Sequence, residues 1–289
     1  MLVTWKPSSK AFYLSKNLAE NLDNFVDGVM NRKTSAVMIF DGKSGQGKTT
    51  LSLQTGCYIN NKVKEWYASK GREDEAPDFT LNNVTWTPDT FIERLKNTKP
   101  GDIIIFDEAM IVSSRSAMSE VNRAIVIMMS MIRSKQLFII FNVNSVFDLD
   151  RNLPLSRADM LAHLYPREGR FAARGSYLVL ASKWIPRLYM SGKKYYDYRI
   201  AHKLKAFNDT FTAFFPFDEI EYERRKQEGV NSISTSGKAD KNTLVRQERD
   251  RYIRYIIDNC PDLTRDDIAR IGKINVKTVY NASIKQDTT

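Results

Sequence analysis

The chain has 289 residues, of which 42% are hydrophobic, and a formal net charge of +10. This length accommodates one sizeable core and a small appended module, and the positive charge favours an anionic partner, nucleic acid or a membrane surface. The two cysteines, Cys57 and Cys260, lie far apart without CxxC spacing, which argues against a disulfide framework or a zinc site and is typical of a reducing cytoplasm. The apolar runs are too short to span a bilayer, and the first residues lack a signal-peptide hydrophobic region. We therefore expect a cytoplasmic protein without membrane insertion.

Apolar periodicity in the first third of the chain predicts a helix, a strand and a second helix. The first helix covers residues 17–31, and the continuous apolar run AVMIF at 36–40 predicts a fully buried strand. The glycine-rich stretch FDGKSGQGKTT follows, and a helix is expected from Lys48 to about Cys57. Residues 60–79 are polar and mixed in charge, which predicts an exposed excursion.

Strands and helices continue to alternate in the middle of the chain. A strand around NNVTWT at 82–87 leads to a helix that starts at Pro88, with Thr87 as its N-cap. Two further apolar runs, IIIF at 103–106 and LFIIF at 137–141, are separated by a helix over 117–134. Strands that are apolar on both faces and separated by helices predict an α/β fold, a mostly parallel sheet covered by helices on both faces.

The composition changes in the last third of the chain. The stretch QEGVNSISTSGKADKN is rich in Gly, Ser, Asn and Lys and predicts a flexible linker. We therefore expect one large domain at 1–226, a flexible linker at 227–241 and a small all-α module at 242–289. The aromatic-rich region 167–226 is assigned only to sheet completion or a partner surface.

The glycine-rich stretch fits the pattern G-x-x-x-x-G-K-[ST], between a strand and a helix as the mechanism of this motif requires. Backbone N–H groups of such a loop form a nest for phosphate oxygens, to which the helix N-terminus adds a favourable partial charge. Lys48 is expected to reach the β- and γ-phosphates of ATP, and Thr49 to ligate magnesium. The predicted nucleotide-binding residues are Gly42, Lys43, Ser44, Gly45, Gln46, Gly47, Lys48, Thr49 and Thr50.

The run IIIFDEAM places two carboxylates at the end of a buried strand. The carboxyl edge of an open parallel sheet is where such proteins place their ligands. Asp107 is expected to hold the magnesium ion through its water shell, and Glu108 to orient or deprotonate the attacking water. The loop and the acidic pair together predict an ATP and magnesium site.

With these two motifs in the order observed, the chain resembles the P-loop NTPases of the additional-strand type with a catalytic glutamate. Within them it resembles the HerA/FtsK-like ATPases, on the segments NVTWTPDTFIERLKNTKPGDIIIFDEA and MIRSKQLFIIFNVNSV and over residues 35–166. The resemblance implies a RecA-like fold, a homo-oligomer such as a ring, and DNA as partner. It also implies a polar sensor residue, for which we choose Asn142 although glutamine is more usual there; Asn144 is the alternative.

An arginine finger supplied across a subunit interface is also implied by this resemblance. Arg133 is the first candidate, and Arg151 and Arg157 are the others; any one of them is equally well explained as an ordinary surface or salt-bridged arginine. Lys43 offers a different resemblance, to the signature lysine of the ParA/MinD-like NTPases. Those proteins usually have another loop sequence and lack the adjacent Asp-Glu pair, so we prefer the first resemblance.

The segment DLTRDDIARIGKINVKTVYNASIK at 262–285 resembles a helix-turn-helix. Thr264 and Asp267 predict a capping box, and Asn275 is expected to cap the second helix. The side chains of Ile268, Ala269, Ile271 and Val279 are expected to face inward. The predicted DNA-binding residues of the second helix are Lys277, Thr278, Tyr280 and Asn281. A helical hairpin that contacts only protein is the alternative.

Two functions follow from these motifs. The first is ATP hydrolysis coupled to DNA translocation, packaging or processing by an oligomeric P-loop ATPase. The second is a DNA-binding, nucleotide-gated switch or regulator that hydrolyses ATP slowly without translocating. A metabolic kinase fits less well, because no constellation of residues for a phosphoryl acceptor is recognisable.

Overall fold

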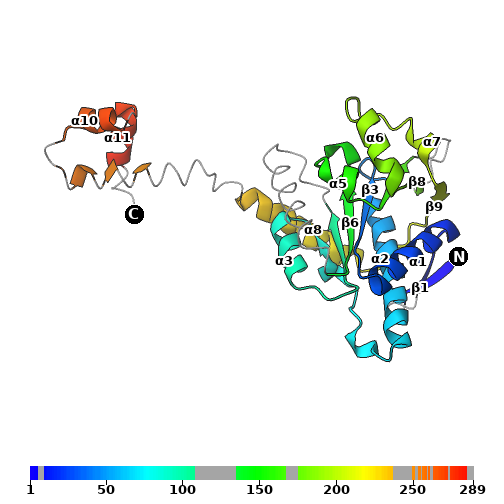
Figure 1. The fold of residues 1–289 in the computed structure, drawn as a ribbon. Coiled ribbons are helices and arrows are strands. Elements are labelled where there is room, and N and C mark those ends of the chain that lie inside the picture. The colour runs from blue at the N-terminus through cyan, green and yellow to red at the C-terminus, as the bar shows by residue number, and fades with distance from the viewer. Residues whose placement is uncertain are drawn as a thin grey trace. The chain divides into compact units, whose positions relative to one another are not determined.

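The computed structural model of the chain describes residues 1–5, 10–107, 135–166 and 175–236, and then 249–250, 253–254, 256–258, 260, 263–272 and 274–284. The chain divides into two compact units, Met1–Val230 and Asn231–Thr289 (Figure 1). Glu108, Arg133 and the helix predicted at 117–134 lie outside the described residues.

Within the described part of the first unit, a seven-stranded sheet has the order β4-β5-β6-β3-β7-β8-β9. The parallel strands are β4 (Val84–Thr85), β5 (Ile103–Asp107), β6 (Phe138–Val143), β3 (Ala36–Asp41) and β7 (Met160–Tyr165). The last two strands, β8 (Ser176–Ala181) and β9 (Phe207–Thr210), are antiparallel and complete one edge. The predicted mostly parallel sheet is confirmed. In this order β6 lies between β3 and β5.

Helices cover both faces of this sheet, which is why its central strands are apolar throughout. Helices α1 (Lys16–Asn31) and α2 (Lys48–Ser69) share one core with strand residues such as Met38 and Phe40. On the other face, Phe91 of α3 (Pro88–Lys96) has its ring 5.1 Å from that of Phe106 and 5.8 Å from that of Phe141. The predicted α1 and the start of α3 are confirmed.

Helix α2 is much longer than the sequence predicts. It continues past Cys57 to Ser69, and Val63 and Tyr67, one turn apart, are buried in the core. Asn60 is also buried and donates its side-chain amide to the Pro77 carbonyl oxygen at 2.8 Å. The exposed excursion predicted at 60–79 is therefore wrong for 60–69, because a polar composition concealed the apolar residues with helical spacing.

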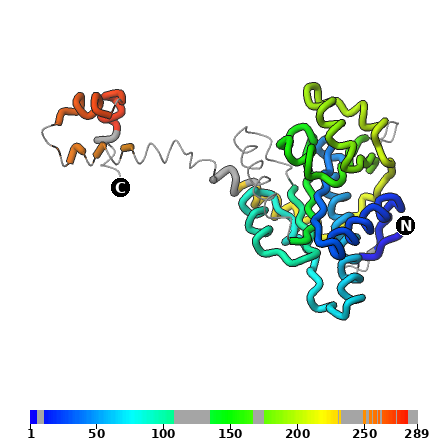
Figure 2. Tube along the Cα trace, in the orientation of Figure 1, coloured from blue at the N-terminus to red at the C-terminus, as the bar shows by residue number. Residues whose placement is uncertain are grey.

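The remaining elements of the first unit surround these layers. A two-stranded hairpin, β1 (Leu2–Trp5) with β2 (Lys10–Tyr13), lies beside α1 near the N-terminus (Figure 2). Short helices α5 (Asn152–Ser156), α6 (Ile185–Gly192) and α7 (Ala201–Leu204) connect or follow the later strands. Aromatic residues such as Phe215 in the connection after β9 pack against the core that α1 and α2 share.

Helix α8 (Glu219–Ser236) extends into the segment predicted as a linker. The linker prediction at 227–241 is wrong for residues 227–236, which are helical, and residues 237–241 lie outside the described residues. The first twelve residues of α8 belong to the first unit, because the division between the units falls after Val230. Its polar sequence is compatible with a helix because ion pairs at helical spacing, such as Arg225 with Glu221 at 2.6 Å, stabilise one.

In the second unit, α10 (Arg265–Ile271) and α11 (Val276–Ile284) pack around the buried side chain of Val279. The Thr264 side chain accepts from the Asp267 N–H at 3.2 Å, so the predicted capping box is confirmed. Ile268 and Ala269 are buried as expected, with Ile253 from the preceding segment. The prediction for Ile271 is wrong: this side chain, at the last residue of α10, is 68% exposed and takes no part in the core around Val279.

Candidate nucleotide-binding site

The backbone of the loop between β3 and α2 requires glycine at two positions. Gly42 has a φ of 143° and a Cβ there would lie 2.5 Å from the Leu164 carbonyl oxygen, while Gly47 has a φ of 88° and a Cβ would meet the Phe211 ring at 2.8 Å. Both φ values are in a region that side chains disfavour. The chain therefore turns sharply from the buried Asp41 into α2, whose first residue is Lys48, and directs the helix N-terminus at the cavity.

Lys48 is buried, and its ammonium group is held by oxygen atoms at the mouth of the loop. Its Nζ donates to the carbonyl oxygen of Gly42 at 2.6 Å, to that of Lys43 at 3.1 Å and to Asn144 Oδ1 at 3.2 Å. These neutral acceptors keep the charge in place, and a phosphate would be a stronger partner because its hydrogen bonds are charge-assisted. Lys48 and Asn144 thus lie together on the cavity wall, where a phosphate could replace the neutral acceptors.

Thr49 and Asp107 meet as expected for a magnesium site. The Thr49 hydroxyl donates to Asp107 Oδ2 at 3.0 Å, and the Tyr222 hydroxyl of α8 donates to the same oxygen. Asp107 is only 2% exposed, and among the described residues its other oxygen, Oδ1, has no hydrogen-bond partner. A hydroxyl and an unpartnered carboxylate oxygen suit Mg²⁺, which takes few protein oxygens and keeps several waters.

Asn142 and Asn144, the two sensor candidates, have different surroundings. Asn142 is 1% exposed, and its amide donates to Ser52 Oγ of α2 at 2.9 Å. Asn144 lies just past the end of β6, lines the cavity and accepts from Lys48. Asn144 therefore combines a place on the cavity wall with a contact to Lys48, whereas Asn142 is held by Ser52 behind the wall.

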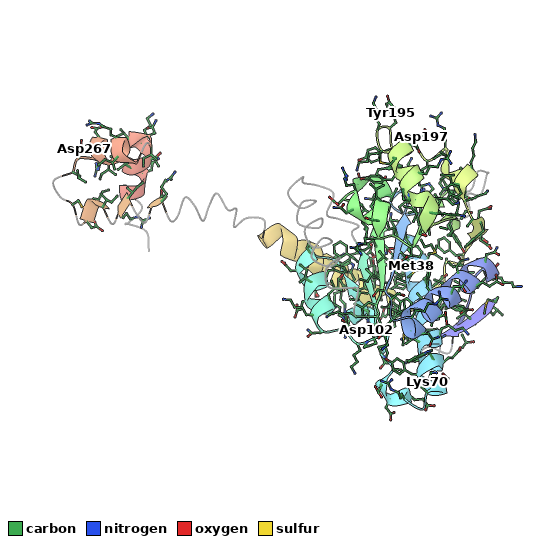
Figure 3. The ribbon with its side chains drawn as sticks, in the orientation of Figure 1. Met38, Lys70, Asp102, Tyr195, Asp197 and Asp267 are labelled. Atoms are coloured by element: carbon green, nitrogen blue, oxygen red, sulfur yellow. The ribbon has the colours of Figure 1, made fainter. Side chains whose placement is uncertain are left out.

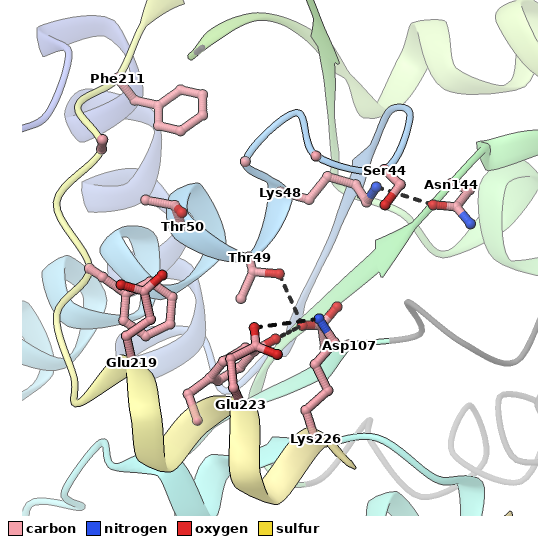
Figure 4. Close-up of a pocket in the computed structure, with 15 residues that line it drawn as sticks. Ser44, Lys48, Thr49, Thr50, Asp107, Asn144, Phe211, Glu219, Glu223 and Lys226 are labelled. Carbon is pink, nitrogen blue, oxygen red and sulfur yellow. Dashed lines mark hydrogen bonds and ion pairs between the residues drawn. The ribbon is translucent and has the colours of Figure 1, made fainter. Parts of the chain in front are cut away.

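The cavity has a volume of about 390 Å³ and extends from the loop to α8 (Figure 4). Burial and the adjacent Asp107 raise the pKa of Tyr222 well above its usual range, so the hydroxyl remains a donor. Sequence reasoning missed this wall, because nothing local indicates that residues near 222 meet a strand end near 107. The lining residues beyond the loop, Asp107 and Asn144 are Phe211, Ala213, Phe215, Glu219, Tyr222, Glu223 and Lys226.

The other predicted site residues are placed as follows. Ser44, Gly45 and Thr50 line the cavity, whereas the Lys43 side chain is exposed on the loop. Arg151 and Arg157, at the two ends of α5, are exposed. In the second unit, Lys277, Tyr280 and Asn281 are exposed on α11 and Thr278 is half-buried, all on one short helix.

Comparison with known proteins decides the class of the first unit. Residues 38–165 match the family model described as the ATPase family associated with various cellular activities (AAA). The chain contains a P-loop NTPase domain. Its fold is RecA-like, and the protein is an ATPase. No curated protein sequence matches the chain. Among the described residues, no helix has the length and apolar character needed to cross a membrane.

Proposed function

We propose that this ATPase works as a homo-oligomer, such as a ring, and couples ATP hydrolysis to the translocation, packaging or processing of DNA. The observation that carries the chemistry is the convergence of Lys48, Asn144, Thr49 and Asp107 on one cavity. The HerA/FtsK-like resemblance and the net charge of +10 support DNA as the partner.

In the proposed reaction, the loop N–H groups and Lys48 bind the phosphates of ATP, and Thr49 and Asp107 hold magnesium, Asp107 through water. Magnesium, when bound, neutralises charge on the β- and γ-phosphates. Glu108 follows Asp107 directly and orients or deprotonates the attacking water. Asn144, in the role first given to Asn142, contacts the γ-phosphate or that water.

The arginine finger comes from a neighbouring subunit in this proposal. Arg133 remains the first candidate, and Arg151 and Arg157, both exposed, are available to a second copy of the chain. Such a finger contributes roughly 10³-fold or more to the rate, because it stabilises charge that develops on the transferring phosphoryl group.

The second unit is proposed as a DNA-binding helix-turn-helix module. Its helices α10 and α11 pack on a small apolar core, and α11 presents Lys277, Tyr280 and Asn281 to solvent. A cation and an amide on one exposed helix face suit contacts to phosphates and to base edges in a major groove. The low cysteine content supports the cytoplasm as the location.

Steady-state ATP turnover, measured against linear duplexes of increasing length, tests the proposal. A translocating enzyme hydrolyses more ATP per encounter on a longer track, so we expect stimulation that rises with length and then levels off. Stimulation that is independent of length would instead favour the nucleotide-gated switch, and no response to DNA would contradict DNA as the partner.

A further inference from the structure

One segment of the first unit concentrates positive charge on the surface. Residues 182–205 include seven Lys or Arg and one acidic residue, so this segment contributes +6 to the chain's net charge of +10. The segment follows β8 and comprises α6, a turn and α7. It belongs to the ATPase unit and is separate from the predicted DNA-binding face of α11.

Several of these cations are available to a ligand. Lys183, Arg187 and Lys194 are exposed and form no ion pair within the described residues. Arg199 is neutralised by Asp197, with 2.7 Å between nitrogen and oxygen. Lys193 is held by the Phe147 carbonyl oxygen and the Tyr189 hydroxyl. The first three cations, together with Lys203 and Lys205, which are also exposed and have no ion pair within the described residues, therefore carry the potential of this surface.

Exposed aromatic rings lie among these cations. Tyr195 is 74% exposed, and the Lys194 ammonium lies 4.9 Å from its ring centroid. Tyr196 adopts a left-handed φ of 53°, unusual for a bulky residue, and donates its hydroxyl to Asp148 at 2.7 Å. Figure 3 shows Tyr195 and Asp197 together at the end of the first unit opposite Lys70. The turn is thus fixed with one ring, that of Tyr195, directed to solvent.

The base of the same turn is connected to the nucleotide loop. The Tyr198 hydroxyl donates to Asp41 Oδ2, and Asp41 is the fully buried residue immediately before Gly42. Asp41 also accepts from the Val146 N–H at 3.0 Å and, through its other oxygen, from His163 Nδ1 at 2.8 Å. Burial and Asp41 raise the pKa of Tyr198 well above its usual range, so this contact persists across the physiological range.

We propose that residues 182–205 form a binding surface for single-stranded nucleic acid, attached to the nucleotide loop through the Tyr198–Asp41 hydrogen bond. Lys183, Arg187 and Lys194 contact backbone phosphates, and the ring of Tyr195 stacks on an unpaired base. A cationic surface with exposed aromatic rings is the combination that single strands need, whereas a duplex offers no base face for stacking. The inference rests on the proposed function in taking DNA as the partner.

The test uses the full chain and a fluorescently labelled oligothymidylate strand, with affinity measured by anisotropy at several salt concentrations. For the double variant Lys183→Ala/Lys194→Ala we expect weaker binding and a salt slope smaller by about 1.4, because each phosphate contact to a single strand contributes about 0.7. Tyr195→Ala should weaken binding roughly tenfold, and Tyr195→Phe should retain it because the ring remains. Lys16→Ala/Lys70→Ala is the matched control, since both lysines are exposed elsewhere on the unit and Lys70 lies over the Trp66 ring.

ATP turnover without DNA should be unchanged in all of these variants, because none of the residues lines the nucleotide cavity. Wild-type protein that binds no DNA at low salt would contradict the proposed function and this surface together. Strand binding that the variants leave unchanged would overturn the surface alone. Phosphatidylserine vesicles provide another anionic ligand: variants that lose vesicle binding but keep strand binding would also overturn the proposal.

Discussion

Lys48 shows how a single side chain prepares the site for its ligand. Its ammonium is buried and held by two loop carbonyl oxygens and by Asn144, so the charge is already at the place where phosphates are expected. Little reorganisation is then needed on binding, which is how preorganised electrostatic sites act.

Lys48→Ala should weaken ATP binding on the order of 100-fold or more, because it removes the one side-chain cation of the loop that is directed into the cavity. Isothermal titration with ATP measures this, and the control is Lys16→Ala, which replaces an exposed lysine of α1.

Glu108→Gln should bind ATP normally and hydrolyse it on the order of 100-fold or more slowly, because glutamine cannot accept a proton. Wild-type turnover in Glu108→Gln would contradict the assignment of the base.

The two asparagines at the end of β6 provide a paired test. Asn144→Ala should lower kcat on the order of 100-fold, as loss of one positioned polar group does, with little change in stability. Asn142→Ala should keep most of its turnover and lose about 0.5–1.5 kcal/mol of unfolding free energy, because the hydrogen bond to Ser52 is removed. The reverse pattern in kcat and urea unfolding would restore Asn142 as the sensor.

The position of helix α8 at the cavity could not be predicted from the sequence. It places Glu219, Tyr222, Glu223 and Lys226 on the cavity wall, and Tyr222 holds the strand-end carboxylate of Asp107. The element therefore connects the residues proposed to hold magnesium with the part of the chain that leads to the second unit.

Tyr222→Phe should lower the unfolding free energy by about 1–3 kcal/mol without nucleotide, because a buried carboxylate loses a donor. With ATP and magnesium present the loss should shrink, since the ion becomes an alternative partner for Asp107. Tyr67→Phe is a suitable control, because it removes a hydroxyl that donates to the Pro100 carbonyl oxygen and does not line the cavity. A Tyr222→Phe loss of equal size with and without magnesium nucleotide would refute the link between α8 and the metal site.

The same elements show which parts of the fold and of the site could be predicted from the sequence. The loop, Asp107 and the buried strands β3, β5 and β6 were predictable because their signals are local: a fixed spacing, or an unbroken apolar run. The choice between Asn142 and Asn144 stayed open because the resemblance implies a polar residue near the end of this strand, and this chain has two asparagines there instead of the usual glutamine. Tyr222 was missed because its partner lies 115 residues away in sequence, and no spacing rule covers such a contact.

On the level of the whole molecule, the proposed oligomer shares its active sites between copies of the chain. Neither Glu108→Gln nor Arg133→Ala should hydrolyse ATP efficiently alone. Mixed oligomers of the two should regain activity, because some interfaces pair an intact arginine with an intact glutamate; each finger contributes on the order of 10³-fold or more. Mixed oligomers that are demonstrated by mass but remain inactive would eliminate Arg133, and Arg151 and Arg157 would be tested in the same way.

The proposed function requires that ATP hydrolysis by this chain moves it along DNA. Displacement of a labelled triplex-forming strand from the far end of a linear duplex measures such movement directly. We predict displacement that requires ATP, is delayed in proportion to the distance travelled and is absent in Lys48→Ala. Hydrolysis that DNA stimulates while the third strand stays bound would contradict the claim and identify the protein as a nucleotide-gated DNA-binding switch.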